Sequence, residues 1–258
     1  MSTLSANTLF HFTRNKENLI SILNSCFYPK YCLEEFYFLP LLKTKWALPM
    51  VCFCDIPLSQ IKNHTLKYGE YAIGLTKEWA QIKGITPILY IPKESPIIRN
   101  FKDSFRALVR NRQSGEKGSV LSSINIEFTN YLLYLAFNTK PYEGFVELNN
   151  KKSNVRFYDE REWRYTVPKE AIITGNEYIY LNKKEFEKTE DVAKRNKLNE
   201  IYGLTFEPKN INYIIVSKES EVLEVMREIR NIKGNFPYND VELLATRILS
   251  MERISEDF

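Results

Sequence analysis

Glu160, Glu162 and Arg164 are the residues of this 258-residue chain whose types and spacing best suit chemistry. They alternate within Phe157–Tyr165, which holds four aromatic, three acidic and two basic side chains in nine positions. On a β-strand, side chains two positions apart point to the same face. Two neighbouring carboxylates repel, which raises the pKa of one of them unless a cation such as Arg164 compensates. A solvated strand with cross-strand ion pairs has the same pattern, so both interpretations stay open here.

We expect one strand to carry these residues, from Val155 to Val167. The segment is rich in β-branched and aromatic residues, and Pro168 ends it. Tyr158, Glu160, Glu162 and Arg164 would then share one face.

His11 is the second candidate, in a short strand predicted over residues 8–13. On a regular strand His11 and Thr13 share a face. A histidine there either completes the edge of a core through a hydrogen bond or contacts a ligand. The other histidine, His64, lies in the polar segment 62–65, and we expect it on the surface.

Tyr68 and Asp55 border predicted strands. Tyr68 precedes Gly69 and the strand expected over 71–75, where a tyrosine either stacks on a planar ligand or packs internally. Asp55 follows the strand expected over 50–54, a position used both for sites and for turns.

A basic face runs along the helix expected over residues 96–112 and consists of Arg99, Lys102, Arg106 and Arg110. Such a face binds nucleic-acid phosphates in some proteins and is merely solvated in others. Nucleic acid therefore stays open as a partner.

The four cysteines lack the spacing of a zinc site. We expect buried, reduced thiols and no metal, because free cysteine is among the most buried residue types. The four are Cys26, Cys32, Cys52 and Cys54.

The periodicity of the chain predicts a single α+β domain over residues 1–258, with helices inserted between groups of strands. Further strands are expected over 87–91 and 211–216. Helices are expected over 15–24, 76–82, 96–112, 119–138, 190–202 and 220–231, and from a capping box at Asn239.

Several classes of protein are disfavoured. The chain has no GxSxG, GxGxxG, P-loop or HExxH motif. It has no apolar run of membrane-spanning length and no basic start followed by an apolar stretch, so we expect a cytoplasmic protein without a signal peptide. The net charge of +4 permits an anionic partner without demanding one.

Four segments, in this order, resemble the AbiGi family of bacterial abortive-infection phage-resistance proteins: LFHFT at 9–13, PMVCFCDIPLS at 49–59, KYGEYAIGL at 67–75 and YDEREWRY at 158–165. The resemblance implies a role in phage defence. It also implies the antitoxin side of a pair whose toxin is of the nucleotidyltransferase type, and hence a partner toxin.

A weaker resemblance is to ADP-ribosyltransferases of the DarT type. Their first strand reads aromatic-His-hydroxyl, and their site ends with a glutamate on a later strand. This resemblance implies a split β-sheet core that binds NAD, with His11 and Thr13 at the nicotinamide ribose and Glu162 catalytic. Glu160 would be the acceptor-side carboxylate and Tyr68 the candidate stacking residue. Arg164 would be the counter-charge of the two glutamates and belong to the cofactor-binding residues. The middle strand departs from that pattern, because Cys52-Phe53-Cys54-Asp55 replaces Ser-Thr-Ser.

These resemblances leave two functions open. One is an NAD-dependent transferase or glycohydrolase, whose oxocarbenium-like transition state a carboxylate stabilises. The other is a non-enzymatic antitoxin that binds a toxin or nucleic acid. A module that binds a signal molecule in the same pocket without turnover is a further alternative.

Overall fold

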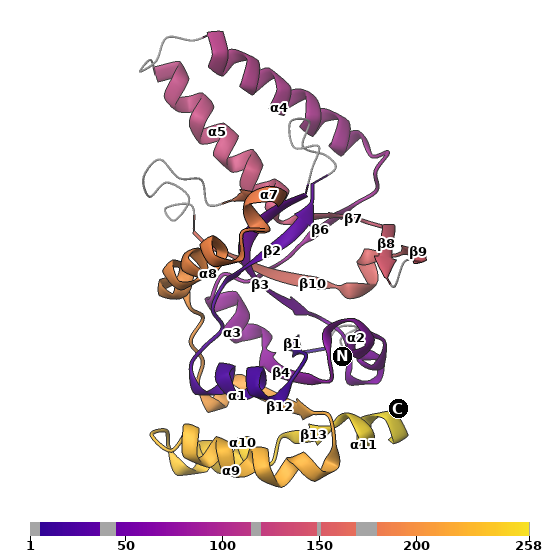
Figure 1. Ribbon diagram of the computed structural model, residues 1–258, viewed down its shortest axis with the longest axis vertical. Coiled ribbons are helices and arrows are strands. Elements are labelled where there is room, and N and C mark those ends of the chain that lie inside the picture. Colours follow the sequence, from indigo (N-terminus) through magenta and orange to yellow (C-terminus); the bar gives the residue numbers. More distant parts are fainter. Residues whose placement is uncertain (1–5, 37–44, 115–119, 149–150, 169–179, 258) are drawn as a thin grey trace.

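A nine-stranded sheet and two small two-stranded ladders form the framework of the chain, as far as it is described. The computed structural model describes residues 6–36, 45–114, 120–148, 151–168 and 180–257. Its mixture of strands and helices agrees with the α+β prediction (Figure 1).

The main path of the sheet runs, in spatial order, through β13 (Ile248–Ser250), β12 (Ile211–Val216), β4 (Tyr71–Thr76), β1 (Thr8–Thr13), β3 (Lys45–Cys54), β10 (Glu162–Thr166) and β5 (Thr86–Pro87). Two further strands pair with β3, namely β2 (Lys30–Glu35) and β11 (Leu181–Asn182). The separate ladders are β6 (Leu89–Ile91) with β7 (Thr139–Pro141), and β8 (Gly144–Leu148) with β9 (Lys151–Val155).

The sheet opens between β1 and β3. Strand β1 pairs with β4 along its whole length, from Thr8 opposite Thr76 to Thr13 opposite Tyr71. Against β3 it makes a single pairing, Phe10 opposite Cys54. The other half of β3 pairs with β2 instead. The two strands that carry the first two motifs therefore meet at one point and diverge from it.

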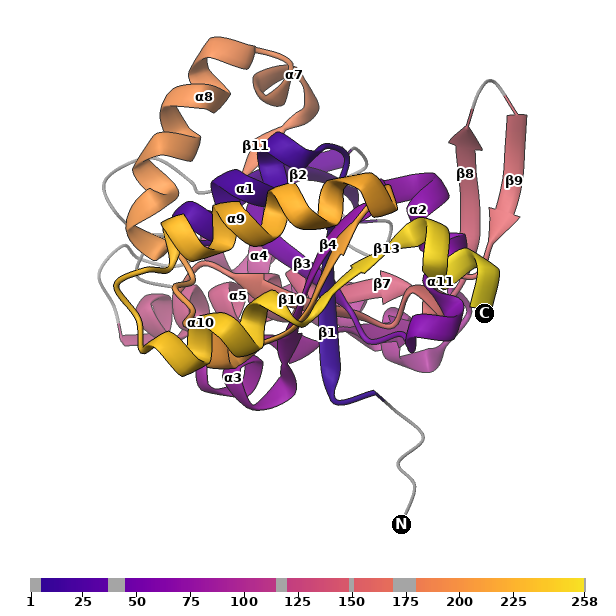
Figure 2. The same cartoon turned by 90° about the horizontal axis from the view of Figure 1, so that it is seen from below.

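The long helices are α4 (Pro96–Ser114) and α5 (Val120–Phe137), which form a hairpin at one end of the molecule (Figure 1). At the other end lie α9 (Val222–Ile232), α10 (Tyr238–Ala245) and α11 (Met251–Asp257), close to β12 and β13 (Figure 2). The other helices are α1 (Lys16–Asn24), α2 (Lys62–Tyr68), α3 (Lys77–Ile82), α7 (Lys183–Phe186) and α8 (Thr189–Leu198). Short 3₁₀ turns occur at Leu58–Gln60, Phe157–Glu160, Asn199–Tyr202, Pro208–Asn210 and Glu219–Glu221.

Local sequence explains the helices next to the opening. The Asn15 side chain caps α1 by accepting a hydrogen bond from the Asn18 backbone N–H. Leu19 and Leu23, four positions apart, bury one face of α1 in the main core. The same core takes in the middle of β3 and the α9 side chains Val225 and Ile229. One face of α1 is thus fixed, and Asn18, Ser21 and Ile22 of the same helix border the opening.

The structure corrects the prediction of a single strand from Val155 to Val167. Phe157–Glu160 forms a 3₁₀ turn, and Arg161 has a positive φ of 43°. The strand β10 begins only at Glu162. Positive φ is unfavourable for a side chain such as arginine, and strand propensity alone did not predict it.

Three smaller predictions also need correction. The strand expected over 87–91 is split between β5 and β6, which belong to different sheets. The last predicted helix begins at Tyr238 without a side-chain cap, so the capping box at Asn239 is wrong. Strand β2 was not predicted.

Candidate ligand-binding site

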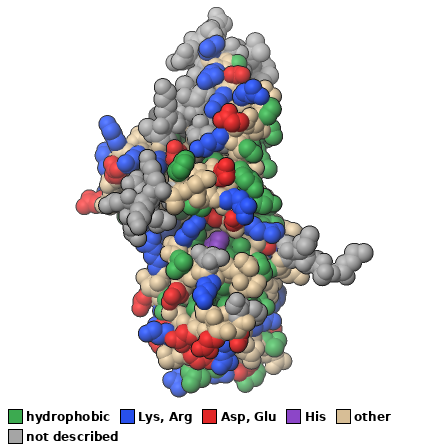
Figure 3. Space-filling view, turned by 90° about the vertical axis from the view of Figure 1, so that its right-hand side faces the viewer, with side chains coloured by type: hydrophobic (Ala, Val, Ile, Leu, Met, Phe, Trp, Pro, Cys, Tyr) green, Lys and Arg blue, Asp and Glu red, His purple; other side chains and the backbone are tan. Residues whose placement is uncertain are grey.

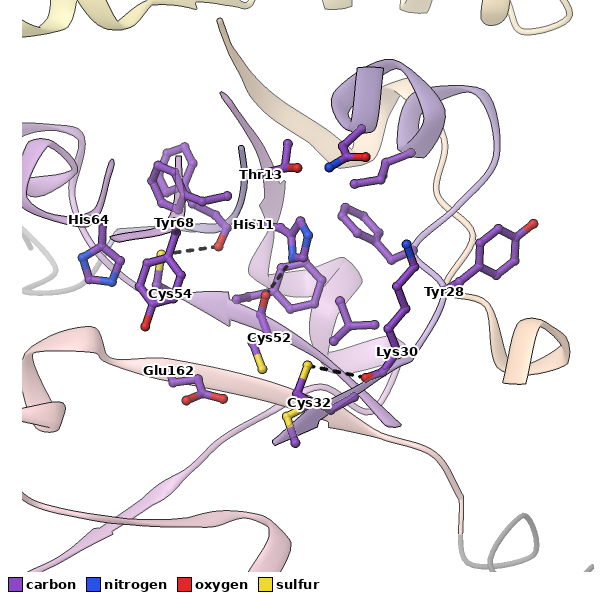
Figure 4. Close-up of a pocket in the computed structure, with 18 of the residues that line it drawn as sticks. His11, Thr13, Tyr28, Lys30, Cys32, Cys52, Cys54, His64, Tyr68 and Glu162 are labelled. Carbon is purple, nitrogen blue, oxygen red and sulfur yellow. Dashed lines mark hydrogen bonds between the residues drawn. The ribbon is translucent and has the colours of Figure 1, made fainter. Parts of the chain in front are cut away.

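A cavity of about 490 Å³ lies where β1 and β3 diverge. Its walls include β1 (residues 10–13), β3 (residues 50–54), β2, α1 and α2 (Figure 4). This volume falls within the roughly 300–1,000 Å³ of small-molecule sites. The structure brings His11, Thr13, Tyr68, Glu160 and Glu162 together in its lining.

His11 bridges the opening. Its Nδ1–H donates a hydrogen bond of 2.8 Å to the Cys52 carbonyl oxygen, on the stretch of β3 that β1 no longer pairs with. Burial is the main reason why the pKa of His11 is lowered, and the charge of Lys30 adds to it. The imidazole is therefore neutral at neutral pH, and its Nε2 is left as an acceptor. His11 thus has the satisfied hydrogen bond of the first interpretation and also lines the cavity, while its contact with a ligand stays a prediction.

Gly69 holds α2 against β1. It has φ +106°, and a Cβ atom there would lie 2.3 Å from the Thr13 carbonyl oxygen. This close approach brings Tyr68 and His64 to the cavity beside Thr13. Tyr68 donates a hydrogen bond of 3.1 Å from its hydroxyl to Oε1 of Glu160.

His64 corrects the prediction of a surface histidine. It lines the cavity, and its ring centroid lies 5.9 Å from that of Phe12 and 5.6 Å from that of Tyr68. Burial lowers its pKa. Its Nε2 atom is buried and has no hydrogen-bond partner among the described residues.

Glu160 and Glu162 reach the cavity by different backbone geometry. Glu160 ends the 3₁₀ turn, and Arg161 has a left-handed backbone conformation. Glu162 then starts β10 opposite Cys54. The backbone N–H of Glu162 donates to the Tyr90 hydroxyl at 2.8 Å. Both glutamates are buried, 7% and 6% exposed, so they are not a solvated charge run.

Lys140 joins the two carboxylates. Its Nζ lies 3.1 Å from Glu160 Oε2 and 2.8 Å from Glu162 Oε2. It comes from β7, just after the end of α5, and its side chain is 14% exposed. Burial disfavours its charge, but the carboxylates of Glu34, Glu162 and Glu160 raise the pKa of Lys140 well above its usual value.

Arg164 lies behind Glu162 and does not line the cavity. Its Nε and Nη2 both lie 2.8 Å from Glu162 Oε1, and Nη1 donates to the Phe137 carbonyl oxygen. Glu34 Oε1 lies 3.6 Å from Nη2. The structure thus places Arg164 as a support for Glu162, away from any ligand in the cavity. It is the counter-charge predicted from the sequence, on the same strand face as Glu162.

These cations keep Glu162 ionised. Burial opposes ionisation, yet Arg164 and Lys140 outweigh it and lower the pKa of Glu162 to about 2. A carboxylate offers about four acceptor positions. Arg164 Nε donates one hydrogen bond to Oε1 and Lys140 donates one to Oε2, whereas Arg164 Nη2 lies beside Oε1 without a hydrogen bond to any described residue. Oε2 can therefore still accept one hydrogen bond from a ligand hydroxyl.

All four cysteines of the chain line the same cavity as free thiols. Burial raises the pKa of each, to about 11 for Cys32. Within the described ranges, no group of three or more His, Cys, Asp or Glu side chains is arranged to hold a metal ion.

Asp55 lies outside the cavity lining. Its Oδ2 pairs with Lys77 at 2.7 Å, and its backbone N–H donates to the Arg161 carbonyl oxygen. These contacts fit a structural residue that fixes the turn before Glu162.

None of the residues of the basic face of α4 lines the cavity. Arg99, Arg106 and Arg110 are exposed and Lys102 is half-buried, whereas Phe105 packs inward. Arg106 pairs with Asp103 at 3.1 Å. In Figure 3, several blue side chains lie in the coloured part of the upper end, with red ones among them, and red side chains gather towards the lower end.

Sequence reasoning missed Lys140 and Glu34, which complete the ion-pair network. Lys140 stands in no motif, and only the tertiary fold brings β7 next to β10. Of the described residues, no helix is long and apolar enough to cross a membrane.

The fold and the site define an α+β protein whose sheet opens around one cavity, with a buried network of glutamates and cations in its wall. The chain belongs to the AbiGi family. The family profile described as "Putative abortive phage resistance protein AbiGi, antitoxin" matches residues 25–217. A relative from Lactococcus lactis subsp. cremoris, the abortive phage resistance protein AbiGi, is 26% identical over 259 aligned positions. These cover 90% of this chain and 99% of the relative. No solved structure matches the fold.

Proposed function

We propose that this phage-defence protein binds NAD in the cavity between β1 and β3 and breaks its nicotinamide–ribose bond, transferring ADP-ribose to a macromolecule or to water. The observation that carries the proposal is the convergence of two sequence-distant groups on one cavity. They are His11 with Thr13 on β1, and Glu160, just before β10, with Glu162 at its start.

The proposed chemistry requires an ionised carboxylate next to the ribose. When the N-glycosidic bond breaks, its electron pair goes to the pyridinium nitrogen, and nicotinamide leaves neutral. Positive charge develops on the ribose, and the incoming nucleophile loses a proton to solvent water as it bonds to C1′. A carboxylate held charged at neutral pH stabilises the cation where it forms, which fits the low pKa of Glu162.

The neutral His11 would orient the ligand through its Nε2 acceptor, since Nδ1 is committed to Cys52. The hydroxyl of Thr13 and the ring of Tyr68 add a polar contact and a flat surface to the same wall.

The test is incubation of the purified protein with NAD labelled in the adenylate phosphate, with and without cell lysate. We expect labelled macromolecules or free ADP-ribose, and loss of both in Glu162→Gln. No transfer and no nicotinamide release by the wild-type protein would refute the proposal.

A second function has an observation in its favour. Both oxygens of Glu162 already contact cations, and the matching family is described as an antitoxin. In that case the protein would bind a partner toxin, and the cavity would hold a ligand without turning it over. Co-purification with the product of a neighbouring gene, unchanged by Glu162→Gln, would support this function over the first.

A further inference from the structure

Two lysines line the cavity, and only one of them is neutralised. Lys140 is paired with both Glu160 and Glu162. Lys30, the first residue of β2, lies opposite Met50 of β3. Lys30 has no carboxylate within ion-pair distance anywhere in the described ranges. The cavity therefore has one balanced end and one end with an uncompensated positive charge.

The two ends lie on opposite sides of His11. In Figure 4, Lys30 and Tyr28 are on one side of the His11 ring, and Glu162, Tyr68 and His64 are on the other. The charge of Lys30 is close enough to act on the buried His11 ring. Burial lowers the pKa of His11 most, and the charge of Lys30 lowers it further. The ammonium thus acts on the interior of the cavity as well as on solvent.

Two neutral donors line the same cavity from α1. The Asn18 amide and the Ser21 hydroxyl are uncommitted, because neither side chain has a hydrogen bond to any residue that the structure describes. Leu19 and Leu23 fix the opposite face of α1 in the core, which holds these polar groups at the cavity. An ammonium with neutral donors and no carboxylate partner is a typical phosphate-binding set.

We propose that Lys30, Asn18 and Ser21 form an anion subsite of the cavity that takes the diphosphate of a nucleotide ligand. This proposal rests on the proposed function and specifies how the ligand lies. The diphosphate would contact Lys30, and the nicotinamide ribose would lie past His11 beside Glu162.

The test is calorimetric titration of the full chain with NAD, ADP-ribose and nicotinamide riboside. Lys30→Met should raise the Kd of NAD and of ADP-ribose about tenfold or more, because it removes a charged hydrogen bond. Nicotinamide riboside has no diphosphate, so Lys30→Met should change its Kd by less than about twofold. Lys30→Arg should retain most of the affinity.

Lys16→Met is the matched control. Lys16 is the first residue of α1, the helix that carries Asn18 and Ser21, but its Nζ pairs with Glu224 Oε2 at 2.7 Å. Its removal should leave the Kd of ADP-ribose unchanged. If Lys30→Met binds ADP-ribose as tightly as the wild-type chain, the anion subsite is refuted.

Titration with inorganic diphosphate separates this proposal from the preceding one. Lys30-dependent binding of diphosphate without binding of NAD would support the subsite and refute NAD as the ligand. Binding of NAD that ignores Lys30→Met would refute the subsite and leave NAD as the ligand. Binding of neither would refute both.

Discussion

Lys140 Nζ lies 2.8 Å from Glu162 Oε2, although the two residues come from separate sheets and are 22 positions apart. The same ammonium reaches Glu160. Lys140 is therefore the cation shared by the two glutamates, whereas Arg164 contacts Glu162 and Lys67 lies 3.5 Å from Glu160.

Replacing Lys140 by methionine should destabilise the protein by about 3–5 kcal/mol at pH 7, because it leaves two buried carboxylates short of a cation. The pKa of at least one carboxyl should then rise above its unfolded value. A raised carboxyl pKa favours the folded state at low pH, so the loss should shrink as pH falls from 7 to 5. Urea denaturation at both pH values measures this.

Lys140→Arg is the control, since it keeps the cation. It should lose less than the methionine variant, and its loss should not shrink at pH 5. A Lys140→Met variant with the same loss of stability at both pH values would contradict the charge-pairing role.

Gly69→Ala should be among the most damaging single-methyl changes in the chain. Positive φ adds about 1–3 kcal/mol of strain, and the clash with the Thr13 carbonyl adds about 1–3 kcal/mol of overpacking. The matched control is Gly84→Ala. Gly84 also has positive φ, 72°, but nothing lies within 4 Å of an added Cβ. Gly84→Ala should lower the free energy of unfolding by only about 1–2 kcal/mol.

Thermal or urea unfolding of the two alanine variants makes the comparison. Equal losses at Gly69 and Gly84 would mean that the approach of α2 to β1 is not tight.

Arg161→Gly should leave the free energy of unfolding unchanged or raise it by up to about 1 kcal/mol, because glycine tolerates the observed positive φ. The side chain contributes little, since it is 45% exposed and lies 3.9 Å from Asp55. Arg161→Val should lower the stability, because a β-branched residue is least compatible with positive φ. The opposite order of the two variants in urea denaturation would show that the turn before Glu162 has another conformation.

The thiols provide a direct report on the cavity. Because burial raises the pKa of all four cysteines, the folded chain should react with iodoacetamide at pH 8 at least about tenfold more slowly than the unfolded chain. Saturating NAD should slow the reaction further, since all four cysteines line the cavity. Mass spectrometry of the alkylated chain measures the rate. Identical rates with and without NAD would place any NAD elsewhere.

Much of the framework follows from local sequence. The strand expected over 8–13, the helix expected over 15–24 and the strand expected over 211–216 match β1, α1 and β12 closely in their bounds. Short-range propensity is enough for these elements, because their buried faces repeat with the period of a strand or a helix.

The site is only partly predictable. His11, Thr13, Tyr68 and the two glutamates line the cavity together, but the strand that was expected to align the glutamates is interrupted at Arg161. Lys140 could not be found, because its role comes from a contact that only the tertiary fold creates. His64 was placed on the surface because its sequence neighbours are polar.

The most direct measurement is the rate of nicotinamide release from NAD by the purified wild-type chain, Glu162→Gln and Glu162→Asp. Glu162→Asp keeps a carboxylate between Arg164 and Lys140, but its side chain is one methylene shorter. This variant therefore tests whether the position of the carboxylate matters in a protein that retains its ion pairs. We predict measurable release by the wild-type chain, with both variants, shown to be folded by thermal unfolding, slower by at least about 100-fold. Wild-type rates in both variants, or no release by the wild-type chain, would contradict a catalytic Glu162.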